Sequence, residues 1–300
     1  MKKIILDSTA RLEIPNLTLA AGFFDGMHLA HQKLLETARD KGHPNGMLTL
    51  SEHIPSLLGN RKYQMLTTLS DKEEIASMYG LDYFIVLEVD RALIELTPED
   101  FAFRYLSSCK TIIVGFDFSF GRHGSGKPQL LEKLFPGKVE VVPEMQSGGE
   151  KIGSTRIKQY LESGDIEKAN NLLGRPYRIK GTIVKGHRRG HVLGYPTANV
   201  DYKDYILPLP GVYMTKTTIE NESFFSLTNI GDNPTFSDRQ MTLESHLFGF
   251  GRESYNETAM IDFLAYLRPE IRFDTPEELK KQVEADEMKL KKAIENGRIK

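Results

Sequence analysis

The chain has 300 residues, 40% hydrophobic and 27% charged, with a formal net charge of −2, which is ordinary for a soluble globular protein of about two domains. This near-neutral balance argues against a protein that holds nucleic acid by bulk charge, and no apolar run approaches the ~18 residues of a membrane span. The single cysteine, Cys109, excludes an internal disulfide and a cysteine-based zinc site, so we expect a reducing, cytoplasmic location.

The first 150 residues alternate between β-rich runs and stretches with helical signals. The predicted strands cover residues 17–24, 46–50, 83–87, 111–118 and 139–142, and the predicted helices cover residues 31–41, 70–79, 98–106 and 128–135. Ser70 with Glu73 forms a capping-box pattern, and Thr97 followed by Pro98 predicts another helix start. Strands that alternate with helices predict an α/β domain whose parallel sheet is buried on both faces.

The pattern changes after Gly174. Two predicted helices, at 155–163 and 166–173, lead into short β-prone runs broken by Gly, Pro and Asn, at 178–184, 211–219, 224–230, 242–248 and 259–267. Such runs predict a small antiparallel barrel. A charged helix follows over 276–295, where Thr275 with Glu278 gives a capping box and Pro276 takes the first position. We therefore expect two domains, at 1–174 and 175–300.

The sequence AGFFDGMHLAH, residues 21–31, places a glycine turn between an apolar strand and a helix. His28 and His31 are three residues apart, so at a helix start they share one face. A helix start offers free N–H groups and a positive dipole end, and two imidazoles added there can donate hydrogen bonds to a polyphosphate. The alternatives for this pair are a metal site and two partly exposed histidines.

A second glycine-rich segment, KGHRRGHVLGYPTAN, covers residues 185–199. Its glycines allow backbone N–H groups to approach an anion closely, and its arginines lie between them. The residues concerned are Gly186, Arg188, Arg189, Gly190 and Gly194. Thr197 and Asn199 are two residues apart, so in an extended segment their oxygens point the same way and suit Mg²⁺ carried by a nucleotide. The alternatives are a basic surface hairpin and a nucleic-acid patch.

The first of these motifs resembles the adenylyltransferase module of bacterial bifunctional riboflavin kinase/FAD synthetases, which is a Rossmann-like nucleotidyltransferase. VGFDFSFG at 114–121 and IGSTRIK at 152–158 are similar to two further segments of that module. The resemblance implies that catalytic His28 and His31 hold the phosphates of ATP and that Asp117 helps to bind the flavin substrate. The other residues implied at the ATP phosphates are Gly22, Asp25, Ser154, Thr155 and Lys158.

The second motif resembles the riboflavin kinase signature of the same family, and PGVY, NIGDNPTF, LESHL and FLAYLR are similar to its other segments. The resemblance implies that Glu244 is the general base that accepts the proton of the ribityl 5′-hydroxyl as this hydroxyl attacks the γ-phosphorus of ATP. It also implies that Thr197 and Asn199 hold Mg²⁺ and that Arg268 contacts the flavin.

The resemblance covers nearly the whole chain. It implies a Rossmann-like nucleotidyltransferase domain with a parallel sheet, followed by a small antiparallel β-barrel domain with a long terminal helix. It further implies an enzyme that phosphorylates riboflavin to FMN with ATP and Mg²⁺ and then adenylylates FMN to FAD. The expected partners are riboflavin, FMN and ATP, with no nucleic acid and no membrane, and the sequence leaves the oligomeric state open.

Several positions depart from the family pattern. Ala30 adds a Cβ where backbone usually approaches the nucleotide, Gly153 replaces a serine, and Lys158 replaces an arginine and loses its bidentate fork. These departures leave a riboflavin kinase with an inactive or regulatory N-terminal module as the alternative. A flavin-sensing or RNA-binding regulator on the same fold is a third possibility, which the intact second motif disfavours.

Overall fold

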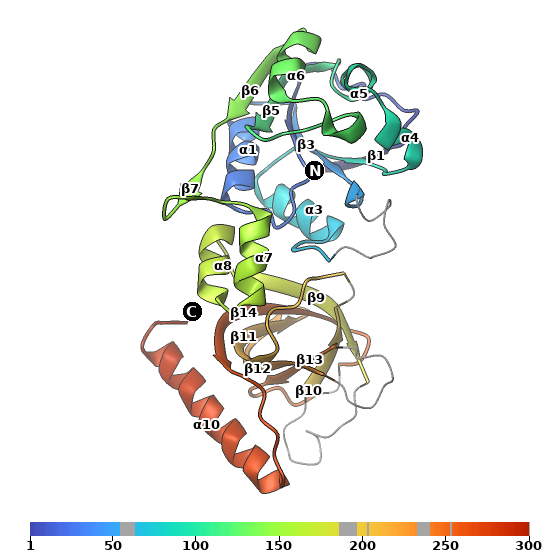
Figure 1. Ribbon diagram of the computed structural model, residues 1–300. Coiled ribbons are helices and arrows are strands. Elements are labelled where there is room, and N and C mark those ends of the chain that lie inside the picture. The colour runs from blue at the N-terminus through green and yellow to red at the C-terminus, as the bar shows by residue number, and fades with distance from the viewer. Residues whose placement is uncertain (55–63, 186–196, 203, 233–240, 253, 300) are drawn as a thin grey trace. The chain divides into compact units, whose positions relative to one another are not determined.

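The computed structural model describes residues 1–54, 64–185, 197–202, 204–232, 241–252 and 254–299 (Figure 1). By its internal contacts the chain divides into two compact units, Met1–Ser154 and Thr155–Lys300. The sequence placed the boundary at Gly174. The difference concerns helices α7 (Ser154–Glu162) and α8 (Ile166–Leu173), because the contacts group both of them with the barrel that follows.

The first unit contains a six-stranded parallel sheet in the order β1-β4-β3-β2-β5-β6. The strands are β1 (Lys2–Leu6), β2 (Leu17–Ala21), β3 (Asn45–Leu50), β4 (Tyr83–Leu87), β5 (Cys109–Gly115) and β6 (Lys138–Val142). The predicted parallel sheet is confirmed. Strands β2 and β5 end earlier than their predicted ends because the chain turns after Ala21 and after Gly115. The sequence missed β1.

Helices cover both faces of this sheet (Figure 1). They are α1 (Leu29–Asp40), α3 (Leu69–Met78), α4 (Arg91–Glu95), α5 (Pro98–Tyr105) and α6 (Pro128–Leu134), with a short 3-10 turn, η1 (Arg122–Gly124). Helices α1 and α3 share one core with Met47 and Phe84, whereas α4, α5 and α6 pack in a second core with Ile85 and Ile112. A small hairpin, β7 (Gln146–Ser147) and β8 (Glu150–Lys151), completes the unit.

The start of α3 differs from the prediction. The capping box forms between Thr68 and Asp71, two residues earlier than the predicted pair of Ser70 and Glu73. The Thr68 hydroxyl accepts from the Asp71 N–H at 3.2 Å, and the Asp71 carboxylate accepts from the Thr68 N–H at 2.8 Å. Both pairs fit the local pattern, and the structure forms the earlier one. The predicted start of α5 at Thr97 and Pro98 is confirmed.

The second unit contains the predicted barrel, which is closed and antiparallel in the order β10-β13-β12-β11-β14-β9. Its strands are β9 (Tyr177–Val184), β10 (Thr197–Asp201), β11 (Gly211–Ile219), β12 (Glu222–Asp232), β13 (Met241–Leu247) and β14 (Thr258–Arg268). Helix α10 (Pro276–Glu295) follows, as predicted. The Thr275 side chain accepts from the Glu278 N–H, but the Glu278 carboxylate accepts from Asp274 rather than from Thr275.

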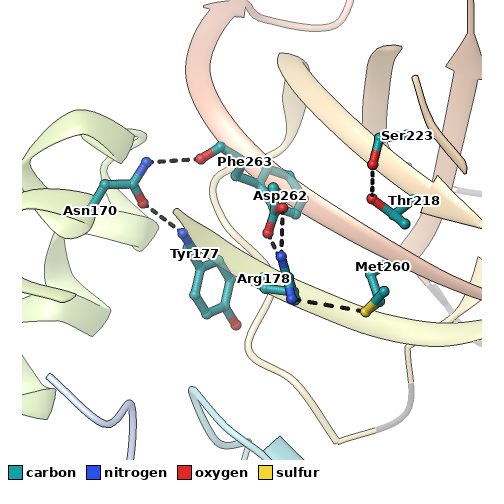
Figure 2. Close-up of polar contacts among 8 residues, drawn as sticks. All are labelled: Asn170, Tyr177, Arg178, Thr218, Ser223, Met260, Asp262 and Phe263. Atoms are coloured by element: carbon teal, nitrogen blue, oxygen red, sulfur yellow. Dashed lines mark hydrogen bonds and ion pairs between the residues drawn. The ribbon is translucent and has the colours of Figure 1, made fainter. Parts of the chain in front are cut away.

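Asn170 connects α8 to the barrel (Figure 2). Its amide donates to the carbonyl of Phe263 at 2.8 Å and accepts from the N–H of Tyr177 at 2.7 Å, so one side chain bridges β14 and β9. Beside it, Arg178 binds the Asp262 carboxylate through two nitrogens at 2.7 and 2.8 Å. These contacts explain why α8 packs with the barrel.

Candidate functional site

The first candidate site lies where the sheet order changes direction. In the sheet, β3 and β4 follow on one side of β2, whereas β5 and β6 lie on its other side. Ligands of open parallel sheets bind outside the carboxyl ends of the strands at such a point. Strand β2 ends at Ala21 and β5 ends at Gly115, so the turn that carries His28 and the segment that carries Asp117 both begin there.

The turn after β2 has an uncommon backbone. Phe24, Gly26 and Met27 have positive φ angles of 59°, 81° and 45°. A non-glycine residue in this region costs on the order of 1–2 kcal/mol, and it persists only where the surroundings fix it. Gly22 precedes these residues and donates its N–H to the carbonyl of Leu48 at 3.1 Å.

Side chains from distant parts of the first unit hold this turn by its carbonyl groups. The Phe23 carbonyl accepts from Thr49 and Lys72, the Asp25 carbonyl accepts from Ser154, and the Met27 carbonyl accepts from Gln32, all at 2.7–3.0 Å. The turn is therefore anchored by strand β3, helix α3, the first residue of α7 and helix α1.

Asp25 supports the turn from the inside. Its side chain is 3% exposed, and its Oδ1 accepts from the backbone N–H groups of Leu66 and Thr67 at 2.8 and 3.3 Å. The Thr67 hydroxyl in turn accepts from the Gly26 N–H at 2.9 Å. These contacts tie the segment before α3 to the turn, so Asp25 holds the shape of the site. The predicted contact between Asp25 and ATP stays a prediction.

His28 and His31 stand at the start of α1 with their rings stacked, 3.6 Å between centroids and 16° between planes. His28 caps the helix, because its Nδ1 accepts from the His31 N–H at 3.4 Å. Burial, followed by the nearby His28, Lys72 and Lys151, lowers the pKa of His31 well below its usual value, so His31 is uncharged at neutral pH. Its Nδ1 is buried and has no hydrogen-bond partner among the described residues.

The described residues give no support to the metal alternative for this pair, since within them no three His, Cys, Asp or Glu side chains are grouped as metal ligands. The uncharged His31 ring, stacked on His28 at a helix start, offers hydrogen bonding without a positive charge of its own. The arrangement therefore suits hydrogen bonding to a polyphosphate whose charge is partly neutralised by bound cations.

Two lysines of this site were missed by the sequence analysis. Lys151 on β8 forms an ion pair with Asp117 and lies 4.8 Å from the Phe116 ring. Lys72 is buried on α3. The signal for Lys72 was its position on the buried face of a predicted helix, where lysine is rare unless it has partners. The signal for Lys151 was its place directly before IGSTRIK.

The segment after β8 contains the other predicted residues. Ser154 reaches the turn through its bond to Asp25. A Cβ built on Gly153 would meet only the Lys151 side chain, at 3.8 Å, so the serine of the family pattern fits there without backbone change. Thr155 and Lys158 lie on α7, three residues apart and hence on one helix face, in the second compact unit.

The second candidate site lies on the outer face of the barrel. In the register of β10, β13 and β12, Glu244 stands opposite Asn199 on one side and opposite Asn229 on the other. Directly opposed side chains have Cβ atoms about 4.5–5.5 Å apart. The alternate residues Ala198 and Ser245 are buried in the interior, so these polar side chains and Thr197 face outward and are partly exposed.

Thr197 and Asn199 thus lie on the strand that pairs with the strand of Glu244, and the roles predicted for the three residues stay predictions. The predicted phosphate-loop residues Gly186, Arg188, Arg189, Gly190 and Gly194 lie outside the described residues. The sequence analysis assigned no role to Asn229.

Arg268, the predicted flavin contact, is engaged by α10. Its Nε donates to the Asp286 carboxylate at 2.7 Å, and its Nη1 donates to the carbonyl of Pro269 at 3.0 Å. The side chains of Arg268 and Asp286 are 13% and 1% exposed. Arg268 therefore anchors the terminal helix to β14, and its contact with a flavin stays a prediction.

Comparison with known proteins agrees with this two-site architecture. The family described as riboflavin kinase matches residues 173–294, and the family described as FAD synthetase matches residues 12–156. A bifunctional riboflavin kinase/FMN adenylyltransferase of Listeria monocytogenes is 38% identical over 91% of this chain and 90% of its own length. The protein of the same name in Bacillus subtilis is 33% identical over 93% of each chain.

A solved structure has the same fold throughout. The crystal structure of a protein named macrolide-efflux protein, from Streptococcus pneumoniae, superimposes with a TM-score of 0.87 and 28% identity over 95% of this chain and 97% of its own. The name belongs to that protein alone. In the part of the present chain that the structure describes, no helix is both long enough and apolar enough to cross a membrane.

Proposed function

This chain belongs to the family of bifunctional riboflavin kinase/FMN adenylyltransferases, and on that basis we propose which of its residues carry out the two reactions. It is a transferase with both a riboflavin kinase domain and an FAD synthetase domain, which favours the bifunctional enzyme over a kinase with an inactive module. We propose a cytoplasmic enzyme of small molecules, riboflavin, FMN and ATP, with neither nucleic acid nor membrane as a partner.

We assign the adenylyltransferase to residues 1–174 and the kinase to residues 175–300. The reason is that α7 contains the predicted phosphate-binding residues Ser154, Thr155 and Lys158, and Ser154 bonds to the turn of the first site. We therefore count α7 with the adenylyltransferase. The contacts of α7 and α8 lie with the barrel, so these helices connect the two functional domains while packing with the second.

The kinase reaction depends on Glu244. Its carboxylate accepts the proton of the ribityl 5′-hydroxyl as that oxygen bonds to the γ-phosphorus of ATP, while the bond from the γ-phosphorus to ADP breaks. The observation that carries this proposal is the position of Glu244 between Asn199 and Asn229 on neighbouring strands. Asn199 and Glu244 stand side by side on one face of neighbouring strands, whereas the Asn229 amide donates to the Glu270 carboxylate at 3.1 Å.

Thr197 and Asn199 fit a magnesium ion. Both present oxygen atoms on the partly exposed outer face of β10, beside a carboxylate, and magnesium prefers hard oxygen ligands shared with substrate phosphates. When bound there with ATP, the ion neutralises charge on the phosphates.

The adenylyltransferase reaction depends on the turn between β2 and α1, residues 22–28, which leads to His28 and His31 and is called the dihistidine turn below. A phosphate oxygen of FMN bonds to the α-phosphorus of ATP, and the bond to pyrophosphate breaks. His28 and His31 donate hydrogen bonds to the phosphate oxygens as charge develops on them, aided by Ser154. Asp117 helps to place FMN, and an ion pair with Lys151 holds the Asp117 carboxylate in position.

The test resolves flavins by chromatography after incubation with ATP and Mg²⁺. Wild-type protein should form FMN from riboflavin and FAD from FMN. The Glu244→Gln variant should lose FMN formation and keep FAD formation from added FMN. FMN without FAD from the wild type would remove the adenylyltransferase assignment, absence of FMN would remove the kinase assignment, and a joint loss in Glu244→Gln would contradict the division into two sites.

A further inference from the structure

Lys72 is a cation inside the first unit that the proposed reactions do not use. Its side chain is 1% exposed, and it is among the largest fully buried side chains of the protein. Removing an ammonium group from water is costly unless polar partners replace the water. A lysine retained at such a position calls for a functional explanation.

Two of its contacts are with Phe23, a residue of the turn that precedes His28. The Lys72 ammonium donates to the Phe23 carbonyl at 2.7 Å and lies 4.0 Å from the centre of the Phe23 ring. The same carbonyl accepts from the Thr49 hydroxyl at 3.0 Å. Two donors, from α3 and β3, therefore fix the direction of a single carbonyl group.

The direction of this carbonyl controls the strained part of the turn. The Phe23 carbonyl and the Phe24 N–H lie in one peptide plane, because the peptide bond is planar. Phe24 is the first of the left-handed residues, with φ of 59°. Fixing the carbonyl thus fixes the plane from which the chain enters the left-handed turn that leads to His28.

The charge of Lys72 also acts on the histidines. After burial, the titratable groups that lower the pKa of His31 are His28 at the helix cap, Lys72 from α3 and Lys151 from β8. The His28 and His31 rings are only 3.6 Å apart, so two protonated rings would repel each other strongly. The nearby ammonium of Lys72 therefore favours the uncharged form of His31.

We propose that Lys72 is a positioning residue for FAD synthesis, an inference that rests on the adenylyltransferase function proposed above. Its ammonium fixes the Phe23 carbonyl and thereby the turn that presents His28 and His31 to the polyphosphate. Being 1% exposed, Lys72 acts through the turn rather than by contact with substrate.

The first measurement compares Lys72→Met and Lys72→Arg with Lys33→Met in the full-length protein. Lys33 is a matched control because it lies on α1, is 52% exposed and contacts only Glu36 among the described ion pairs. Lys72→Met should lower kcat for FAD synthesis by about tenfold or more, in the range of a lost positioning contact. Lys72→Arg keeps a cationic donor, so its kcat for FAD synthesis should lie between those of Lys72→Met and Lys33→Met. Riboflavin kinase activity, which belongs to the second unit, should stay unchanged in all three, and thermal unfolding followed by circular dichroism checks that the first unit is folded.

The second measurement follows the His31 ring by NMR as the pH is lowered, in protein labelled at histidine. In Lys72→Met the His31 resonance should begin to titrate at a higher pH than in the wild type, since a nearby cation is gone. A purely structural role would leave this titration unchanged. The NMR titration does not depend on enzyme activity, so it tests the role of Lys72 even if the wild type makes no FAD. Absence of FAD formation by the wild type would instead overturn the proposed adenylyltransferase function.

Two results would overturn the inference: FAD synthesis in Lys72→Met equal to that of Lys33→Met, or an unshifted His31 titration. If circular dichroism shows that Lys72→Met does not fold, Thr49→Val replaces it, because that variant removes the other donor to the same carbonyl without removing a charge. FAD synthesis should then fall by a few-fold while the kinase is retained, and unaltered FAD synthesis would again overturn the inference.

Discussion

At the scale of single residues, the two glycines Gly153 and Gly181 have opposite surroundings. Gly153 faces open space next to Lys151, so its departure from the family pattern removes a hydroxyl without any steric cause. Gly181 lies on β9 where β10 passes closely, and a Cβ there would overlap the backbone of Asp201. Packing therefore leaves room for a side chain at position 153 in the candidate phosphate loop. At position 181 it requires glycine, because β9 and β10 approach each other closely there.

Gly153→Ser should therefore leave stability within about 0.5 kcal/mol of the wild type, and Gly181→Ser should cost about 3 kcal/mol by forcing β9 from β10. Thermal unfolding followed by circular dichroism compares the two. If the added hydroxyl of Gly153→Ser binds phosphate, the KM for ATP in FAD synthesis should also fall. Equal melting temperatures for both variants would contradict the difference in packing.

At the scale of elements, the barrel interior contains a ring of hydroxyl groups. Five fully buried side chains on β11, β12 and β13 form it, with oxygen separations of 2.7–3.0 Å around the ring: Thr215, Ser226, Thr217, Ser245 and Thr228. Each hydroxyl can donate once and accept once, so all five are satisfied. Ser245 and Thr228 adjoin Glu244 and Asn229, so the ring fixes the register that turns Glu244 outward.

Thr217→Val should destabilise the second unit by about 1–3 kcal/mol, because it leaves the buried hydroxyls of Ser226 and Ser245 short of a partner. The matched control is Thr218→Val on the same strand. The Thr218 hydroxyl contacts Ser223 at the exposed surface, so its loss should be nearly neutral (Figure 2). Urea unfolding followed by circular dichroism measures both. Equal losses would show that β propensity or packing dominates, rather than the ring.

A mostly buried ion pair between Arg268 and Asp286 connects α10 to strand β14. Asp286→Ala should cost about 3–5 kcal/mol, because it leaves a mostly buried guanidinium without its carboxylate. The double variant Arg268→Met, Asp286→Leu removes both charges and should recover much of this loss. Thermal unfolding of the single and double variants distinguishes the cases. A double variant as unstable as Asp286→Ala would mean that the pair matters for shape and not for charge.

At the scale of the whole molecule, the sequence predicted what local signals determine. Both domain types, the parallel sheet, the barrel and the start of α10 at Pro276 followed from periodicity, caps and motifs. Contacts between distant segments were not predictable. Strand β1 pairs with β4 far along the chain, and Lys72 donates to a carbonyl in the turn after β2. Likewise, no local pattern places Asn229 opposite Glu244, since the barrel register sets that pairing.

Because His31 belongs to the first unit and Glu244 to the second, variants at these residues should complement each other. In a mixture with riboflavin, ATP and Mg²⁺, His31→Asn makes FMN and Glu244→Gln converts it to FAD. FAD should appear after a lag that shortens as more Glu244→Gln is added, since FMN must leave one molecule and bind another. Each variant alone, given riboflavin, should form no FAD. A mixture that accumulates FMN without FAD, although Glu244→Gln converts added FMN, would show that FMN stays bound to the chain that makes it and would contradict exchange between molecules.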